Sequence, residues 1–227
     1  MLREEKIKNL MAAHDFNRAL ATSIALERAD LKTILLRRRK NETLETNYSR
    51  SCLEAAREDS VSLGLAVHGH KRLRGRVLSI DKYSFQLLTD GSADPEEIHK
   101  TVVKYAYNAS DFKLVRKAHN IDNRVKKLAL EPIVRVKDRH HFKNLTLQQA
   151  IDDGTQVEVI TLEGDVFRGK VRWFGRWEFE MIVKGDVKVT VFRHGVYRLT
   201  PYKKGEGKSG ARSSQKGGKS GKKKARR

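Results

Sequence analysis

Apolar and polar residues alternate through most of residues 157–197, the most regular hydrophobic pattern in the chain. Alternation with a period of two is typical of a strand with one buried face. Gly164 lies where a hairpin would turn, and Gly169 falls five residues later, inside a strand. A glycine inside a strand lets the sheet bend sharply, and Gly175 follows after six more residues. We therefore expect short antiparallel strands, bent strongly enough to close a small barrel.

A weaker copy of this pattern lies upstream, at residues 62–107. Gly69 takes the place of the turn, Gly75 that of the bend, and residues 101–107 that of the return strand. The two glycines are six residues apart rather than five, and a polar insertion at 90–95 lengthens the later hairpin. Because an internal repeat decides a fold more strongly than local propensity does, we predict two related units.

Helical periodicity is found outside these two units. Within residues 1–40, apolar residues recur at spacings of three, four and seven without Pro or Gly, which predicts one helix ending near Lys40. Shorter helices are expected at 48–57 and at 146–151, one before each unit, with Thr146 as the N-cap of the second.

The glycine-bent strands and the short basic strand after them resemble the two signatures of the Sm-like family, which includes the bacterial RNA chaperone Hfq. The first signature matches Val157 to Met181, and the second matches Val191 to Val196. Arg193 and His194 resemble a Lys-His pair that Hfq uses for RNA. A helix before the first strand is also similar to Hfq. The resemblance implies an α+β protein, mainly β, with two small Sm-like bent-sheet barrels, each preceded by a helix.

The predicted organisation has five parts: a helical extension, a first Sm-like repeat, a basic linker, a second Sm-like repeat and a disordered basic tail, at residues 1–45, 46–111, 112–143, 144–201 and 202–227. The linker is expected to hold a partial helix before Pro132 and a short strand at 133–136.

The charge of the chain favours a polyanion as partner. The formal net charge is +20, and residues 202–227 carry half of it, with eleven Lys and Arg against one Glu. This segment has no large apolar side chain that anchors a core, so we expect it to be disordered. A mobile cationic arm gains affinity for RNA phosphates through counterion release; the alternative is a tail that only aids solubility.

Compartment and class follow from the composition. The single cysteine, Cys52, excludes an intrachain disulfide and fits a reducing cytoplasm. No long apolar run predicts a membrane span, and the charged N-terminus lacks the apolar core of a signal peptide. A cytoplasmic protein without membrane association is expected.

The sequence offers little for catalysis. The close histidine pairs are His68 with His70 and His140 with His141, and neither has the spacing or cysteine partners of a known zinc motif. No phosphate-binding glycine loop or nucleophile motif is present. We expect no enzyme activity, cofactor or metal; a metal-dependent enzyme built on these histidines is the alternative.

Recognition of single-stranded RNA needs a flat ring for stacking and a cation for the phosphate. Each unit has two dipeptides of this kind: Lys82-Tyr83 and Lys104-Tyr105 in the first, and Arg176-Trp177 and Arg193-His194 in the second. The resemblance implies that each set converges on a uridine-binding pocket. Trp177 shares strand parity with Phe179 and Met181, so a core position for it stays open. The tail would add phosphate contacts from Lys222, Lys223, Lys224, Arg226 and Arg227.

The sequence thus predicts an RNA-binding protein, a partner of single-stranded and uridine-rich RNA in post-transcriptional regulation or RNA chaperoning. Sm-like units pair their edge strands into rings, so two units per chain are compatible with a trimeric pseudo-hexamer, or with a monomer in which the units pair with each other. The alternative function is a ribosome-associated structural or translation-related RNA-binding protein.

Overall fold

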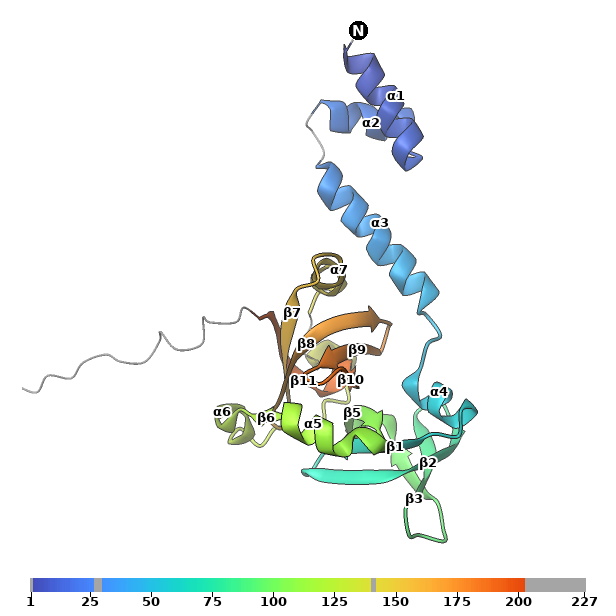
Figure 1. Ribbon diagram of the computed structural model, residues 1–227, viewed down its shortest axis with the longest axis vertical. Helices are drawn as coiled ribbons and strands as arrows, with labels where there is room; N and C mark the ends of the chain where they lie inside the picture. Colours follow the sequence, from blue (N-terminus) through green and yellow to red (C-terminus); the bar gives the residue numbers. More distant parts are fainter. Residues whose placement is uncertain (1, 27–29, 140–141, 203–227) are drawn as a thin grey trace, which may run out of the picture.

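The computed structural model describes residues 2–26, 30–139 and 142–202. It is an α+β protein in which N-terminal helices precede a large antiparallel sheet. Figure 1 shows the first three of these helices rising away from the sheet as an arm, whereas the fourth lies beside the sheet. The N-terminal helices are α1 (Leu2–His14), α2 (Arg18–Ala25), α3 (Leu31–Thr46) and α4 (Cys52–Glu58). No helix within the described ranges is long and apolar enough to cross a membrane.

The single helix expected over residues 1–40 is wrong, because polar residues cap new helices inside the apolar pattern. Asp15 has a left-handed backbone, with φ at 51°, and ends α1. The Asn17 side chain accepts a hydrogen bond from the Leu20 amide at 2.9 Å and starts α2. Asp30 caps α3 in the same way, accepting from the amides of Lys32 and Thr33 at 3.1 Å each. The arm has its own small apolar cluster.

The sheet is built from two modules of five strands with the same order. Module 1 comprises β1 (Ser62–Val67), β2 (Lys71–Ile80), β3 (Ser84–Thr89), β4 (Glu96–His99) and β5 (Val103–Asn108). Module 2 comprises β7 (Gln156–Thr161), β8 (Asp165–Phe174), β9 (Glu178–Val183), β10 (Val187–Phe192) and β11 (Val196–Pro201). In each module the last strand pairs with the first, giving β5-β1-β2-β3-β4 and β11-β7-β8-β9-β10.

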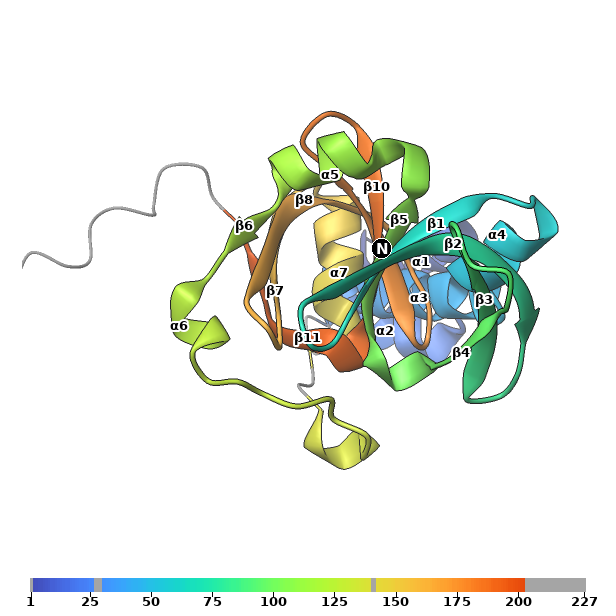
Figure 2. The ribbon, with the colours of Figure 1, turned by 90° about the horizontal axis from the view of Figure 1, so that it is seen from below.

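The expectation of two closed barrels is wrong, because the modules share one open sheet. Strand β10 of module 2 pairs with β5 of module 1, through Thr190 opposite Ala106 and Val191 opposite Tyr105. Module 1 would close if β4 paired with β5, and module 2 if β10 paired with β11. Neither closes, because the free edges of β5 and β10 pair with each other. We call this junction the seam. Figures 1 and 2 show both modules curving away from it.

The two modules repeat each other in detail. Gly75 in β2 pairs with Thr89, and Gly169 in β8 pairs with Val183. A Cβ on either glycine would lie 2.2 Å from a carbonyl oxygen of the neighbouring strand. Each ladder then shifts register at the same distance beyond its glycine, between Val77 and Ser79 and between Val171 and Trp173. The strand-interior glycines are therefore needed where the sheet bends, as the sequence predicted.

The apolar cores cross the seam. Tyr105 and Tyr107 of module 1 belong to the core of module 2, where the Tyr105 ring meets that of Phe167 edge-on at 4.8 Å. Phe192 of module 2 belongs to the core of module 1.

A buried charge network reinforces the seam. The Lys104 ammonium is 2% exposed, lies 2.8 Å from an Asp165 carboxylate oxygen and also pairs with Glu163. Asp165 is held further by His119, at 2.8 Å from Nε2, and by the Thr161 hydroxyl, at 2.9 Å. Burial alone would raise the pKa of Asp165, but the hydrogen bond to His119 and the charge of Lys104 hold that pKa below its usual value. The network thus ties module 1 to the β7–β8 turn of module 2.

The segment between the modules runs around the outside of the sheet (Figure 2). It contains η2 (Ala109–Asp111), α5 (Phe112–Ala118), β6 (Asn120–Ile121), α6 (Asn123–Lys126) and η3 (Val136–Asp138). The strand expected at 133–136 is absent, because the Arg139 side chain donates to the carbonyls of Ile133 at 3.1 Å and Val134 at 2.9 Å, in place of a neighbouring strand.

Helix α7 (Asn144–Asp152) precedes module 2, as expected, but begins two residues before Thr146, which is therefore not its N-cap. The expected helix at 48–57 is the shorter α4, capped by Ser51. Helix α3 lies against α7: the Thr43 hydroxyl donates to Gln148 at 2.8 Å, and Arg39 pairs with Asp152 at 3.1 Å.

Candidate nucleic-acid interface

The two modules present the same kind of turn at the same position. Lys82 and Tyr83 form the β2–β3 turn, and Arg176 and Trp177 form the β8–β9 turn. Tyr83 is 62% exposed and Trp177 52%. The Lys82 ammonium lies 5.0 Å from the Tyr83 ring centroid, and the Arg176 guanidinium carbon lies 4.6 Å from that of Trp177. Each turn thus offers solvent an aromatic ring with a cation over it, the combination that stacks a base and meets its phosphate.

A 3-10 turn holds each of these exposed dipeptides in place. The Lys100 amide in η1 (Lys100–Val102) donates to the Tyr83 carbonyl at 2.8 Å. The Arg193 amide in η4 (Arg193–Gly195) donates to the Trp177 carbonyl at 2.9 Å. The backbone of Arg193 therefore lies against the Trp177 turn, while convergence of their side chains on one pocket stays a prediction.

In module 1 the counterpart of Arg193-His194 is different from the one predicted. Lys100 and Thr101 occupy that position, because η1 follows β4 as η4 follows β10. Lys104 and Tyr105 lie on β5 instead, and their side chains are 2% and 1% exposed. They build the seam network and the core, so neither side chain lies on a surface that RNA can reach. The sequence comparison had matched Arg193-His194 with residues of β5, whereas the matching element in module 1 is η1, which precedes β5.

His194 is also buried, at 7% exposure. Its Nε2 lies 2.7 Å from the Val103 carbonyl, which is in module 1, and burial lowers the pKa of the ring to about 4. A neutral imidazole that bonds across the seam positions η4 rather than contacting a ligand.

Arg193 lies beside Trp177 and is mostly covered. Its Nη1 donates to the Asn144 side chain at 2.7 Å, and its guanidinium carbon is 5.1 Å from the Phe142 ring centroid. Burial lowers the pKa of this guanidinium to about 10. Its Nε and Nη2 have no hydrogen-bond partner among the residues that the structure describes. These donors are buried beside the Phe142 and Phe174 rings, so Arg193 supports the turn from within rather than offering a free cation at the surface.

Sequence reasoning missed Tyr48. This residue lies between α3 and α4, is 63% exposed, and accepts a hydrogen bond at its hydroxyl from Arg176 Nη1 at 2.9 Å. The Arg176 guanidinium therefore lies between two exposed rings, those of Tyr48 and Trp177. We call these three residues the aromatic platform. The sequence feature that could have identified Tyr48 is its position as an aromatic residue among polar residues in the connection between two helices.

The histidine pairs form no metal centre in the described parts of the chain. His68 is buried and His70 half-exposed, and the Nδ1 atoms of both lie near Glu163, at 3.9 and 3.7 Å. Within residues 2–26, 30–139 and 142–202, no group of three or more His, Cys, Asp and Glu side chains is arranged to hold a metal ion. His140 and His141 lie outside the described residues, as do Lys222, Lys223, Lys224, Arg226 and Arg227.

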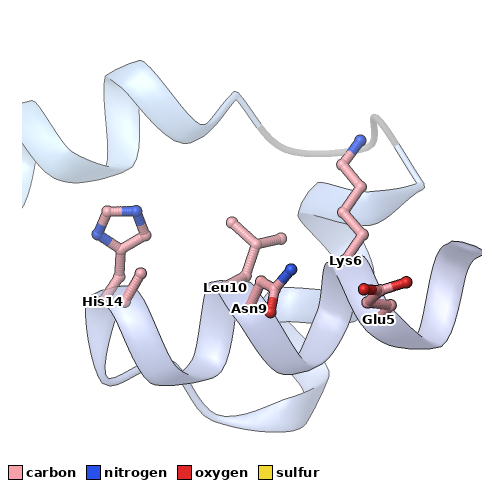
Figure 3. Close-up of a pocket in the computed structure, with 6 residues that line it drawn as sticks. Glu5, Lys6, Asn9, Leu10 and His14 are labelled. Atoms are coloured by element: carbon pink, nitrogen blue, oxygen red, sulfur yellow. The ribbon is translucent and has the colours of Figure 1, made fainter.

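A shallow hollow runs along α1, and Figure 3 shows its lining. It is formed by Glu5, Lys6, Asn9, Leu10, Ala13 and His14. The lining combines one acid, one cation, Asn9 and His14 with two apolar side chains, and none of the six is a Tyr or Trp that could stack a base as Tyr83 and Trp177 could.

No protein-family model matches the chain, and no curated protein is significantly similar to it. The functional argument therefore rests on the geometry of the chain itself.

Proposed function

We propose that this chain binds single-stranded RNA through its two exposed cation–aromatic turns. The observation that carries the proposal is their equivalence: Lys82-Tyr83 and Arg176-Trp177 occupy the same turn in two modules, each exposed and each held by an adjacent 3-10 turn. An exposed ring with a cation over it offers a face for stacking a base and a charge for its phosphate. The net charge of +20 supports a polyanion as that ligand.

The resemblance to the Sm-like family supports the same proposal. Both modules have the glycine-bent second strand on which the resemblance was based in part. Uridine-rich RNA is the proposed preference. Post-transcriptional regulation or RNA chaperoning is the proposed role. The basic tail would strengthen binding to all RNAs by its charge alone.

Assembly into a ring is part of the proposal. Strand β10 of one module pairs with β5 of the other, and β4 and β11 form the two ends of the sheet path. Pairing of β4 from one copy with β11 of the next would repeat the junction found inside the chain. Such a heterologous contact closes into a ring when the rotation per copy permits it, and three copies would give six modules.

The test compares stacking variants with a matched aromatic control. Tyr83→Ala and Trp177→Ala should each weaken binding to a uridine-rich single strand by about 1–3 kcal/mol, the usual contribution of one stacked base. Binding to duplex RNA should hardly change. Tyr202→Ala is the control, because Tyr202 also lies under a cation, Arg168 at 4.7 Å, but away from both turns.

Affinities from fluorescence anisotropy and melting temperatures from circular dichroism would be read together. If both variants remain folded and bind uridine-rich RNA as tightly as the wild type, the proposed function is wrong. Salt-resistant co-sedimentation with ribosomes, without any preference for uridine, would favour a ribosome-associated protein instead.

A further inference from the structure

A groove of about 250 Å³ lies at the seam, beside helix α4. Both modules and the segment before α4 contribute to it. The side chains that matter here are Arg50, Ala106, Asn108, Trp173, Lys188 and Thr190. We call this site the seam groove. It is smaller than the roughly 300–1,000 Å³ of sites for drug-sized ligands, so it suits a single flat ring with its attached sugar.

One wall of the seam groove is an aromatic ring with a cation stacked on it. The guanidinium carbon of Arg50 lies 4.2 Å from the Trp173 ring centroid, and Arg50 Nη1 donates to the Asn47 side chain at 3.3 Å. Trp173 is buried, and its indole N–H has no hydrogen-bond partner within the described part of the chain. Buried indole donors usually find a partner, and an acceptor on a ligand would supply one. An arginine plane is itself a stacking surface for a base.

The charges in the seam groove also suit a nucleotide. Arg50 and Lys188 are exposed and supply two cations for a phosphate. Glu180 lines the groove as well, but its carboxylate is engaged by Arg172 at 2.9 Å. Asp59, at the C-cap of α4, is a second acid in the lining. Asn108 and Thr190 add polar side chains able to contact a base edge.

The seam groove and the aromatic platform are linked by one short segment of chain. The short connection between α3 and α4 carries both Tyr48, which is bonded to Arg176, and Arg50, which covers Trp173. This connection packs closely on the β8–β9 turn, since a Cβ on Gly175 would lie 3.0 Å from the Asn47 carbonyl oxygen. The exposed ring of Trp177 and the Arg50 plane over Trp173 are therefore brought near each other by the same short connection.

We propose that the seam groove binds one nucleotide of a single-stranded RNA whose neighbouring base stacks on Trp177. This inference rests on the proposed function, because the same RNA strand occupies both places. It adds a second binding position to module 2 that module 1 does not duplicate, since α4 and the seam occur once among the described elements. Strands long enough to reach both places should bind more tightly than shorter ones.

Fluorescence of Trp173 can report occupancy of the seam groove directly. The chain has two tryptophans, so Trp177→Phe keeps a ring on the platform and leaves Trp173 as the only reporter. Titration with a uridine hexanucleotide should change Trp173 emission saturably, over the same concentrations as binding measured by anisotropy. Uridine monophosphate should produce this change only at much higher concentration.

A charge pair on one hairpin supplies matched variants. Lys188→Glu places an acid in the seam groove, whereas Lys184→Glu makes the same change in net charge on the β9–β10 turn, outside the groove lining. Lys188→Glu should weaken hexanucleotide binding roughly tenfold more than Lys184→Glu, within the range for losing one bound base. It should also abolish the Trp173 signal.

The outcomes separate this inference from the proposed function. If the wild type binds the hexanucleotide, Trp177→Ala weakens that binding, and yet Trp173 emission stays constant and the two lysine variants behave alike, the seam groove proposal alone is overturned. A response to uridine monophosphate as strong as to the hexanucleotide assigns the groove to a free nucleotide. It overturns the proposal that one RNA strand occupies both the groove and the platform. No binding of RNA by the wild type overturns both proposals.

Discussion

Whether an aromatic or cationic side chain is buried or exposed in this molecule depends on where its strand begins and on partners remote in sequence. The period-two pattern would place Trp177 in the core with Phe179 and Met181. Because β9 begins at Glu178, Trp177 lies outside the strand and the pattern does not apply to it. Phe179 and Met181 are fully buried, as parity predicts, while Trp177 is half exposed. From the sequence alone Lys104 would be expected at the surface. It is buried because it forms ion pairs with Glu163 and Asp165, which are remote in sequence. Local patterns cannot reveal such remote partners.

Glu178 leads to a prediction at this scale. Its carboxylate accepts a hydrogen bond from the Cys52 amide at 2.6 Å, at the start of α4, and burial raises its pKa to about 7. The unfolded value is near 4.5, so the folded state favours the protonated form. Stability from this group is full below pH 4.5 and is lost as the pH rises to 7. Glu178→Gln keeps an acceptor but removes the titration.

We expect Glu178→Gln to match the wild type near pH 4.5 and to be more stable above pH 7, by on the order of 1–3 kcal/mol. Urea unfolding across this pH range measures the difference, in which the opposite effect of Asp165 cancels. Glu45→Gln, at an exposed position in α3, serves as control. A stability difference independent of pH would show that Glu178 does not titrate in this range.

At the scale of elements, the sequence predicts strands better than helix boundaries. Period-two alternation and the glycines located β1, β5 and the long bent strands β2 and β8 to within a few residues. The helices of the arm were merged into one, because apolar spacing continues through Asn17 and Asp30, where side-chain caps interrupt it. A cap competes with the periodic signal over only one or two residues, so periodicity alone misses it.

The bent strands give the second prediction. Gly169→Ala places a Cβ 2.2 Å from the Ile182 carbonyl oxygen, a backbone atom that cannot move without disturbing the β8–β9 ladder. We expect a loss of roughly 1–3 kcal/mol in the free energy of unfolding, and a similar loss for Gly75→Ala in module 1. Lys170→Ala, at the next and exposed position of β8, should change it by less than about 0.5 kcal/mol. Equal denaturation midpoints for Gly169→Ala and the wild type would contradict the bend.

At the scale of the molecule, the sequence predicted two repeats and left pairing between them as one of two alternatives, without identifying the strands that join them. The alternation that predicts a strand does not identify its partner, and the pairing of β5 with β10 depends on residues far apart in sequence, such as Ala106 and Thr190, which are 84 positions apart. The candidate site was predicted in part for a related reason: Arg176, Trp177, Lys82 and Tyr83 were found from local motifs, whereas Tyr48 and the seam groove arise only from tertiary packing.

The ends of the sheet path give the prediction for assembly. If β4 and β11 pair between copies, light scattering should give a mass of about three times the 26.0 kDa chain. Adding uridine-rich RNA should leave the ratio of chains in the complex unchanged. A mass equal to one chain at every concentration tested would restrict the proposal to a monomer whose two modules pair only with each other.

The exchange of aromatic residues across the seam determines whether either module can fold as a separate fragment. A fragment ending after module 1 would lack Phe192 and so leave a hole in its own core, and a fragment starting at α7 would lack Tyr105 and Tyr107. Each fragment would also expose a strand that its partner now covers. The two modules are therefore interdependent for folding: we expect neither to fold alone without changes that fill its core and protect its exposed strand.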